Sequence, residues 1–166
     1  MADITLGGNP VHTSGDLPAE GSKAPDFTLV AADLSRKSLS DFAGKRLLIS
    51  IFPSIDTGVC SKSTHVFAER VKGRDDVAFV TISADLPFAA KRWCGAEGVE
   101  NAMTLSSFDS STFGTDYGIK MVDGALNGLL GRAVLVVDGD GTVLHSQLVP
   151  EIAQEPDYDA ALGALN

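Results

Sequence analysis

The sequence lacks both the long apolar runs of membrane proteins and the basic clusters of nucleic-acid-binding proteins. Its longest apolar run, residues 133–137, falls far short of the roughly 18 residues that a membrane helix needs. The formal net charge is −9, and an acidic chain repels the phosphate backbone of nucleic acids. We therefore expect no membrane insertion and no nucleic-acid partner.

Cysteine is also scarce, since the 166 residues include only Cys60 and Cys94. A small secreted scaffold held by disulfides carries more cysteines in a shorter chain. The two residues do not form a Cys-x-x-Cys pair, and with three scattered histidines they do not compose a zinc site. There is no dinucleotide-binding fingerprint, so we expect neither a cofactor nor a metal. The cysteines are therefore either buried structural thiols or redox-active ones.

The N-terminus has no basic stretch followed by an apolar one, which is the pattern of a secretory signal. This absence predicts a cytoplasmic protein. The alternative stays open that a periplasmic signal was removed ahead of Met1.

Apolar segments of strand length alternate with helical patterns along the chain. Residues 46–52 form a near-continuous apolar run, which is typical of a central strand buried on both faces, and residues 77–82 predict a second strand. A helical pattern follows each strand. The first begins near Thr57, and the second begins near Asp85, which is an N-cap candidate. This alternation indicates an α/β architecture.

Turn signals mark two hairpins, and the chain ends on a helical pattern. Residues 7–10 (Gly-Gly-Asn-Pro) separate two short strands, and residues 138–141 (Asp-Gly-Asp-Gly) separate two more. Residues 158–165 predict a closing helix. With no repeat and no linker, we expect a single domain over residues 1–166. The predicted fold is a three-layer α/β domain with a mixed central sheet flanked by helices and an N-terminal β-hairpin.

Cys60 occupies the position of most chemical interest. It follows the strand predicted at residues 46–52, and sites in open α/β sheets form where a strand passes into a helix. With Thr57 as N-cap, Cys60 is the third helical residue and faces free backbone N–H groups at the positive end of the helix dipole. Both effects favour the thiolate, which is the nucleophilic form. The plainer alternative makes Thr57 only a cap and Cys60 a small buried apolar residue.

Other residues could complete a peroxide-reducing site around this thiol. Thr57 can supply a hydroxyl beside the sulfur, and Pro53, which has no N–H, can shield the pocket from water. Arg132 precedes an apolar strand and could hold the thiolate and a peroxide oxygen with its fork of donors, although a surface salt bridge is the commoner role. His65 is a poor candidate for the base, because five helical positions turn it by about 140° from Cys60.

The string at residues 52–60, Phe-Pro-Ser-Ile-Asp-Thr-Gly-Val-Cys, resembles the peroxiredoxin active-site pattern of proline, threonine and cysteine. In its full form it is similar to the bacterial thiol peroxidase subfamily. Arg132 matches the family's active-site arginine. Cys94, in the helix after the next strand, matches the subfamily's resolving cysteine. The opening at residues 7–10 and the ending at residues 148–159 are also similar, so the resemblance covers essentially the whole chain.

The resemblance implies a thioredoxin-like fold, a homodimer, thioredoxin as the reductant and a preference for alkyl hydroperoxides over hydrogen peroxide. It also implies a mechanism in which the Cys60 thiolate attacks the peroxide and becomes a sulfenic acid. Cys94 then forms a disulfide with Cys60 inside one chain, and thioredoxin reduces it. A disulfide needs Cα atoms within about 7 Å, so we expect the helical turns that carry both cysteines to unwind. The implied catalytic residues are Cys60, Cys94, Thr57, Arg132 and Pro53.

Two other functions remain as alternatives. A non-enzymatic redox sensor would also need a reactive thiol at Cys60, but its oxidation would alter binding to a protein partner, and repeated turnover with thioredoxin would reject it as the main role. A disulfide reductase or isomerase would be detected by an insulin-reduction assay, and the absence of Cys-x-x-Cys argues against it.

Overall fold

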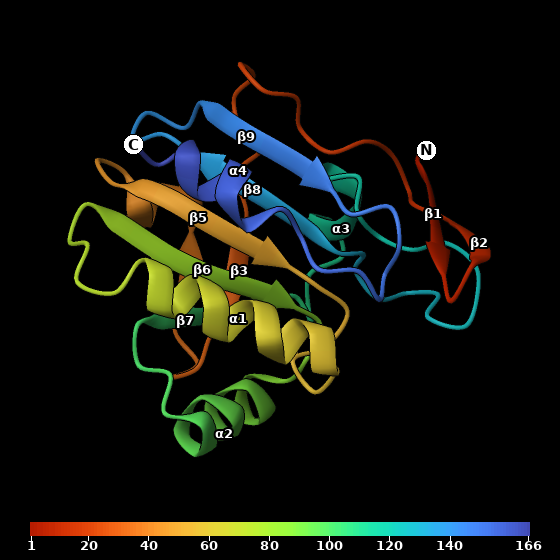
Figure 1. Cartoon of the computed structure of the whole chain (residues 1–166), viewed down its shortest axis with the longest axis horizontal. Coiled ribbons are helices and arrows are strands. Elements are labelled where there is room, and N and C mark those ends of the chain that lie inside the picture. The colour runs from red at the N-terminus through yellow and green to blue at the C-terminus, as the bar shows by residue number, and fades with distance from the viewer.

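The computed structural model describes the whole chain, from Met1 to Asn166. At its centre is a seven-stranded mixed sheet with the strand order β4-β3-β7-β6-β5-β8-β9, and a separate two-stranded sheet lies at one end of the molecule (Figure 1). The seven strands are β3 (Thr28–Ala31), β4 (Arg36–Ser38), β5 (Arg46–Ile51), β6 (Val77–Ser83), β7 (Ala102–Ser106), β8 (Ala133–Val137) and β9 (Val143–Leu148).

Three neighbouring strands, β5, β6 and β7, run parallel, and the strands outside them pair antiparallel. A chain that joins two parallel strands must return to the opposite end of the sheet, so it needs a long connection. Helix α1 (Gly58–Arg70) supplies this connection from β5 to β6, and α2 (Pro87–Glu97) supplies it from β6 to β7. Both helices therefore begin at the same edge of the sheet.

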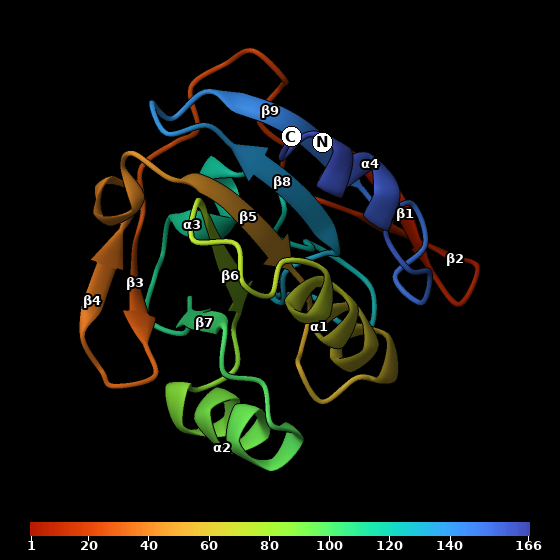
Figure 2. The same cartoon turned by 60° about the vertical axis from the view of Figure 1, so that its left-hand side comes forward.

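Helices cover both faces of the sheet (Figure 2). Helices α1, α2 and α4 (Tyr158–Gly163) pack on one face, and α3 (Phe113–Asp116) with a 3₁₀ turn (Leu39–Phe42) covers the other. Side chains alternate along β5, so that Leu48 contacts the first layer whereas Leu47 and Ile49 contact the second. Burial on both faces explains the continuous apolar run of β5. The predicted three-layer α/β fold with a mixed sheet is confirmed.

The predicted N-terminal hairpin is also confirmed. Its turn is Gly7-Gly8, and both glycines have positive φ angles, 58° and 82°, as a type I′ turn requires. The hairpin lies against the segment after β9: the N–H of Thr5 donates to the Pro150 carbonyl (2.8 Å), and the N–H of Ile152 donates to the Thr5 carbonyl (2.9 Å). The hairpin therefore helps to fix the segment around Ile152. Its two strands are β1 (Asp3–Leu6) and β2 (Asn9–His12).

One local prediction was wrong, because Asp85 does not cap α2. The N-cap is Leu86, without a side-chain hydrogen bond, and Pro87 is the first helical residue. The Asp85 carboxylate instead accepts hydrogen bonds from Ser54 and Ile55 in the loop after β5. The carboxylate that the local pattern assigned to the start of α2 therefore makes a tertiary contact with the loop after β5 instead.

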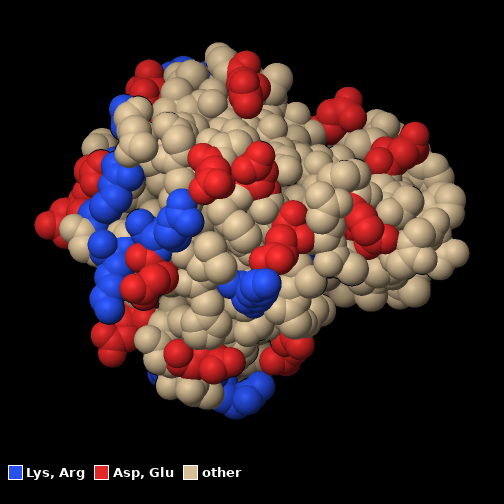
Figure 3. All heavy atoms as spheres, viewed as in Figure 1, with Lys and Arg blue, Asp and Glu red and all other residues tan.

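Charges of both signs are mixed over much of the surface. On the face shown in Figure 3, Lys and Arg side chains lie mainly at the left, next to acidic ones, and the only charged side chains visible on the lobe over β1 and β2 are acidic. Two surface pairs join α1 and the turn after it to acidic residues: Arg70 to Asp159 at 3.0 Å and Arg74 to Asp76 at 2.8 Å. None of the helices combines the length and the apolar composition that crossing a bilayer requires.

Candidate active site

The sheet topology brings Cys60 and Arg132 together, although 72 positions separate them in the chain. Cys60 follows the end of β5, and Arg132 immediately precedes β8. Because β8 is antiparallel to β5 and Ala133 pairs with Ile51, the start of β8 lies beside the end of β5. The two side chains therefore meet at one edge of the sheet.

Cys60 lies in the first turn of α1, where the sequence predicted it. Thr57 is the N-cap, and its hydroxyl oxygen accepts a hydrogen bond from the backbone N–H of Cys60 at 3.4 Å. The same hydroxyl donates to the carbonyl of Ser54 at 3.1 Å, so the loop before the helix is closed on itself. The first N–H groups of a helix have no intrahelical acceptor and form the positive end of its dipole, which favours an anion at this position.

Arg132 places a positive charge directly at the sulfur. Its Nη1 lies 3.2 Å from Cys60 Sγ, and its Nε donates to the carbonyl of Ile152 at 2.8 Å. Both side chains are buried, with 0% exposure for Cys60 and 3% for Arg132. A buried guanidinium is costly without an opposite charge, and Arg132 pairs with no carboxylate. Cys60 Sγ is the only side-chain group hydrogen-bonded to this guanidinium, so Arg132 would pair with a negative charge on the sulfur.

The carbonyl of Ile152 is a part of this site that the sequence analysis did not identify. A backbone oxygen has no side-chain signature, and residues 149–152 stood out only as part of the overall resemblance. Val149 belongs to the same segment, and its N–H donates to the Arg132 carbonyl at 2.9 Å. The segment after β9 therefore holds both the backbone and the side chain of Arg132.

Thr57 and Pro53 lie on the loop that leads to Cys60, as predicted. The Thr57 hydroxyl gives its proton to Ser54, so in this conformation it can offer a peroxide only the lone pairs of its oxygen. Pro53 is buried in the bend between β5 and α1. Its role as a shield against water stays a prediction.

Cys94 lies on α2, apart from the contacts that surround Cys60. It packs at the edge of the apolar cluster that contains Cys60, and it lines a cavity of about 610 Å³ that no residue of the Cys60 loop borders. No disulfide joins the two cysteines. Partial burial raises the pKa of the Cys94 thiol, so at neutral pH this residue rests as the protonated thiol.

His65 faces α2 rather than the thiol, in agreement with its helical position. Its ring lies 5.3 Å from the ring of Trp93, centroid to centroid, and its Nε2 lies 4.0 Å from a carboxylate oxygen of Glu97. Both partners belong to α2, so His65 links the two helices that carry the cysteines.

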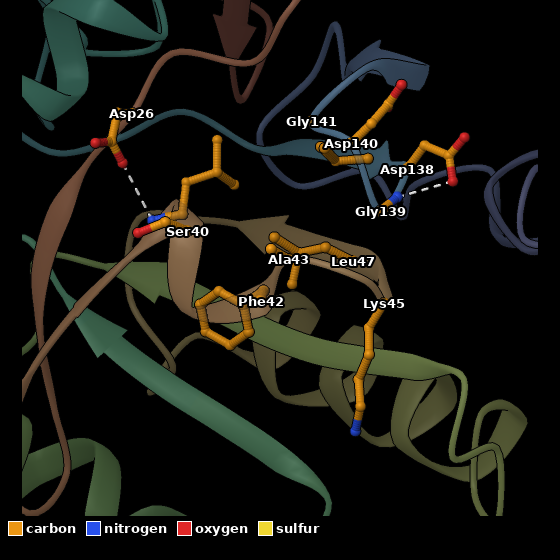
Figure 4. A pocket seen from close by; sticks show the side chains of 12 residues that line it. Asp26, Ser40, Phe42, Ala43, Lys45, Leu47, Asp138, Gly139, Asp140 and Gly141 are labelled. Atoms are coloured by element: carbon orange, nitrogen blue, oxygen red, sulfur yellow. Dashed lines mark hydrogen bonds between the residues drawn. The ribbon is translucent and has the colours of Figure 1, made fainter.

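A second cavity, of about 360 Å³, opens at the other edge of the sheet, where β5 begins (Figure 4). In that view the carboxylates of Asp26 and Asp138 lie on different sides of the cavity, and each accepts a hydrogen bond from a backbone N–H, of Leu39 and Gly139 respectively. None of the predicted site residues lines this cavity. It is separate from the thiol chemistry, and no group of three or more His, Cys, Asp or Glu side chains is arranged to hold a metal ion.

Comparisons with known proteins point to one family. Residues 19–162 match the family described as Redoxin. A curated thiol peroxidase from Mycobacterium tuberculosis is 53% identical over 165 residues, which cover 99% of each chain, and a thiol peroxidase from Mycobacterium bovis gives the same values.

Solved structures agree with this assignment. A peroxiredoxin-like protein from Aquifex aeolicus superposes with a TM-score of 0.93 at 36% identity, covering 99% of this chain and 96% of that one. A thiol peroxidase from Chromobacterium violaceum superposes with a TM-score of 0.91 at 22% identity, covering 98% and 94%, and supports the fold alone. The thioredoxin-like fold with an added N-terminal hairpin is therefore confirmed. The chain belongs to the redoxin family, groups within it with the thiol peroxidases, and is a peroxidase enzyme.

Proposed function

We propose that this peroxidase reduces hydroperoxides through Cys60, forms a disulfide between Cys60 and Cys94 within one chain, and is recycled by thioredoxin. The contact between Cys60 Sγ and Arg132 Nη1, 3.2 Å long and buried on both sides, carries the proposal. A cation against a buried sulfur at a helix start favours the thiolate, which is the form that attacks a peroxide oxygen.

In the first step the Cys60 thiolate attacks the terminal oxygen of ROOH and the O–O bond breaks. The leaving oxygen takes up a proton, so the products are Cys60–SOH and ROH. Donors of Arg132 stabilise the negative charge that develops on that oxygen, and the Thr57 oxygen accepts from the hydroperoxide O–H and orients it. Because Cys60 is fully buried, the peroxide reaches the sulfur only when neighbouring side chains move.

In the second step the Cys94 thiolate attacks the sulfenic sulfur, the S–S bond forms and the oxygen leaves as water. The two cysteines are not bonded, and Cys94 lines a cavity that the Cys60 loop does not border, so we expect the helical turns at both cysteines to unwind in this step. Glycine lowers the free-energy cost of unwinding near Cys94, because Gly95 follows it and α2 ends at Gly98, whose φ is 67°. The thioredoxin dithiol then reduces the disulfide and becomes a disulfide itself.

The substrate and assembly are also part of the proposal. Phe52 and Ile55 are buried in the same apolar cluster as Cys60, which favours organic hydroperoxides over hydrogen peroxide. Two large apolar side chains at the start of α2, Leu86 and Phe88, are 51% and 65% exposed, and a homodimer would remove them from water. Light scattering in solution tests the dimer. We also expect the protein to work in the cytoplasm.

The deciding experiment adds one equivalent of cumene hydroperoxide to the reduced protein and measures the intact mass, followed by peptide mapping. The expected result is the loss of two hydrogens, mapped to a link between Cys60 and Cys94. The Cys94→Ser variant is the matched control, and it should gain one oxygen on Cys60 instead. Repeated turnover with thioredoxin, thioredoxin reductase and NADPH then tests recycling. An unchanged mass would mean that Cys60 is an inert thiol, and the proposal would fail.

A further inference from the structure

The carboxylate of Asp85 connects the two segments that carry the cysteines. Its Oδ1 accepts a hydrogen bond from Ser54 Oγ at 2.7 Å, and its Oδ2 accepts from the N–H of Ile55 at 2.8 Å and from Ser83 Oγ at 2.7 Å. Ser54 and Ile55 belong to the loop that leads to Cys60, whereas Asp85 belongs to the short link between β6 and α2. The loops meet because β5 and β6 are parallel neighbours, so both end at the same edge of the sheet.

Ser54 extends this contact towards the reactive thiol. Its Oγ, which donates to Asp85, also accepts from the N–H of Asp56 at 3.2 Å, and its carbonyl accepts both the N–H of Thr57 at 3.2 Å and the Thr57 hydroxyl at 3.1 Å. The Thr57 oxygen in turn accepts from the N–H of Cys60. A continuous chain of hydrogen bonds therefore runs from the Asp85 carboxylate to the first turn of α1.

We propose that Asp85 is a positioning residue of the peroxidatic site, which holds residues 54–57 in the turn that presents Thr57 and the start of α1 to the peroxide. The loop exchanges between the wound conformation of this structure, in which residues 54–57 and the first turn of α1 are formed, and an unwound one. Hydrogen bonds to an ionised carboxylate are stronger than those between neutral groups, so the contact with Asp85 favours the wound conformation. The inference rests on the disulfide mechanism proposed above, in which the same loop must unwind before Cys94 can reach Cys60.

Removing the Asp85 charge then affects the two steps in opposite directions. The peroxide reaction needs the wound loop, so it slows. Disulfide formation needs the unwound loop, so it accelerates. The sulfenic acid has a competing fate, in which a second hydroperoxide converts Cys60–SOH into Cys60–SO₂H and leaves as ROH. Faster disulfide formation protects the thiol against that second oxidation, so the variant should tolerate higher peroxide concentrations.

The test compares Asp85→Asn with wild type in two measurements. Rapid quenching and mass analysis after mixing with cumene hydroperoxide give the rate constants of Cys60 oxidation and of disulfide formation. Titration with excess peroxide and thioredoxin gives the concentration at which half of Cys60 becomes sulfinic acid. We expect the first rate constant to fall about tenfold, since one charge-assisted hydrogen bond is lost. We expect the second rate constant and the sulfinic threshold to rise.

Two further variants make the test specific. Asp41→Asn is the matched control, because the Asp41 carboxylate also accepts from a backbone N–H and a hydroxyl, both of Ser38, in the 3₁₀ turn that covers the other face of the sheet. It should leave both rate constants unchanged. Ser54→Ala removes the next link without removing a charge, so it should shift the rates in the same directions as Asp85→Asn. The double variant should add little, because both changes break one chain of contacts.

The outcomes separate this inference from the mechanism on which it rests. If wild type forms the disulfide and the folded variants slow both steps, or leave the sulfinic threshold unchanged, Asp85 is only structural and the inference is overturned. If Asp85→Asn does not fold, Ser54→Ala decides by the same criteria. If wild type itself forms no disulfide, the proposed function fails instead. In that case the rate of Cys60 oxidation still tests the positioning role, and an unchanged rate in Asp85→Asn would overturn it.

Discussion

Replacing Arg132 by methionine should separate the charge of this residue from its volume. Methionine fills much of the same space, but it removes the cation whose Nη1 lies 3.2 Å from Cys60 Sγ. The helix start and the Thr57 cap remain, so the thiol keeps its other source of activation. The variant should therefore react with peroxide by the same route, only more slowly.

The size of the loss follows from the geometry. A hydrogen bond to a charged group contributes about 1.5–3 kcal/mol, which corresponds to about 10- to 150-fold in rate. Two unit charges at this separation, with an effective dielectric constant near 20, interact by about 5 kcal/mol, which sets an upper limit of several thousandfold. We expect the second-order rate constant for cumene hydroperoxide to fall by about 10²- to 10³-fold.

Arg132→Lys tests whether the fork of the guanidinium matters beyond its charge. Arg132 uses Nε for the Ile152 carbonyl and Nη1 for the sulfur, and a single ammonium group does not reproduce both contacts in that geometry. The lysine variant should therefore fall between wild type and Arg132→Met. Arg36→Met, which removes a surface arginine paired with Asp109, controls for the loss of positive charge.

Rapid quenching followed by mass analysis of Cys60 measures these rates directly, and far-UV circular dichroism confirms that each variant is folded. A rate for Arg132→Met within about threefold of wild type, which corresponds to about 0.65 kcal/mol in activation free energy, would refute the idea that Arg132 activates the thiol. Equal rates for Arg132→Lys and wild type would refute the role of the guanidinium fork but not that of the positive charge.

Three further predictions follow from individual contacts. Thr57→Val should lower the free energy of unfolding by about 1 kcal/mol in urea titrations and slow Cys60 oxidation, because it removes the cap hydroxyl, whereas Thr57→Ser should retain most of both. Burial raises the pKa of Cys94, so the rate of disulfide formation should increase as pH rises through neutrality, and a flat stopped-flow profile would contradict a Cys94 thiolate as the attacking group. The hydrogen bond to Asp123 raises the pKa of His12 above its ordinary 6.5, and hydrogen bonds from His12 lower that of Asp123 below 3.8. Each of these pKa shifts stabilises the folded protein. The stabilisation is complete between pH 3.8 and pH 6.5, and it is lost above the folded pKa of His12 or below that of Asp123. An NMR titration should show the raised His12 pKa and its return towards 6.5 in Asp123→Asn.

Local sequence signals predicted the parts of the site that lie within one short segment. The cap at Thr57 and the third helical position of Cys60 depend only on residues a few positions apart, so a pattern of residue types was enough. The contact of Arg132 with Cys60 depends on the antiparallel register of β5 and β8, which no local pattern reports. The sequence placed Arg132 before a strand and made it a candidate cation for the thiol, and the resemblance favoured that role over a surface salt bridge.

Elements stabilised by tertiary contacts were the ones that the sequence did not indicate. Strand β4 is Arg-Lys-Ser without an apolar residue, and it exists because it pairs with β3. Helix α3 is a single turn, too short for a helical period, and the buried side chain of Phe113 holds it in the core. The prediction that Asp85 caps α2 was wrong for a related reason. The local pattern of a carboxylate before a proline indicates a cap, but it does not report that Ser54 and Ile55 of a neighbouring loop donate hydrogen bonds to this carboxylate.

On the proposed mechanism, the order of the two chemical steps follows from the surroundings of the two thiols. Cys60 lies at the positive end of α1 against Arg132, whereas Cys94 lies near the negative end of α2, where its own carbonyl accepts the capping N–H of Gly98. Burial and the helix end both disfavour a thiolate at Cys94 while α2 is wound. Unwinding removes both effects at once, so the movement that brings Cys94 towards Cys60 also converts it into a nucleophile. The resolving thiol therefore stays protonated, and so protected from oxidation, while α2 is wound.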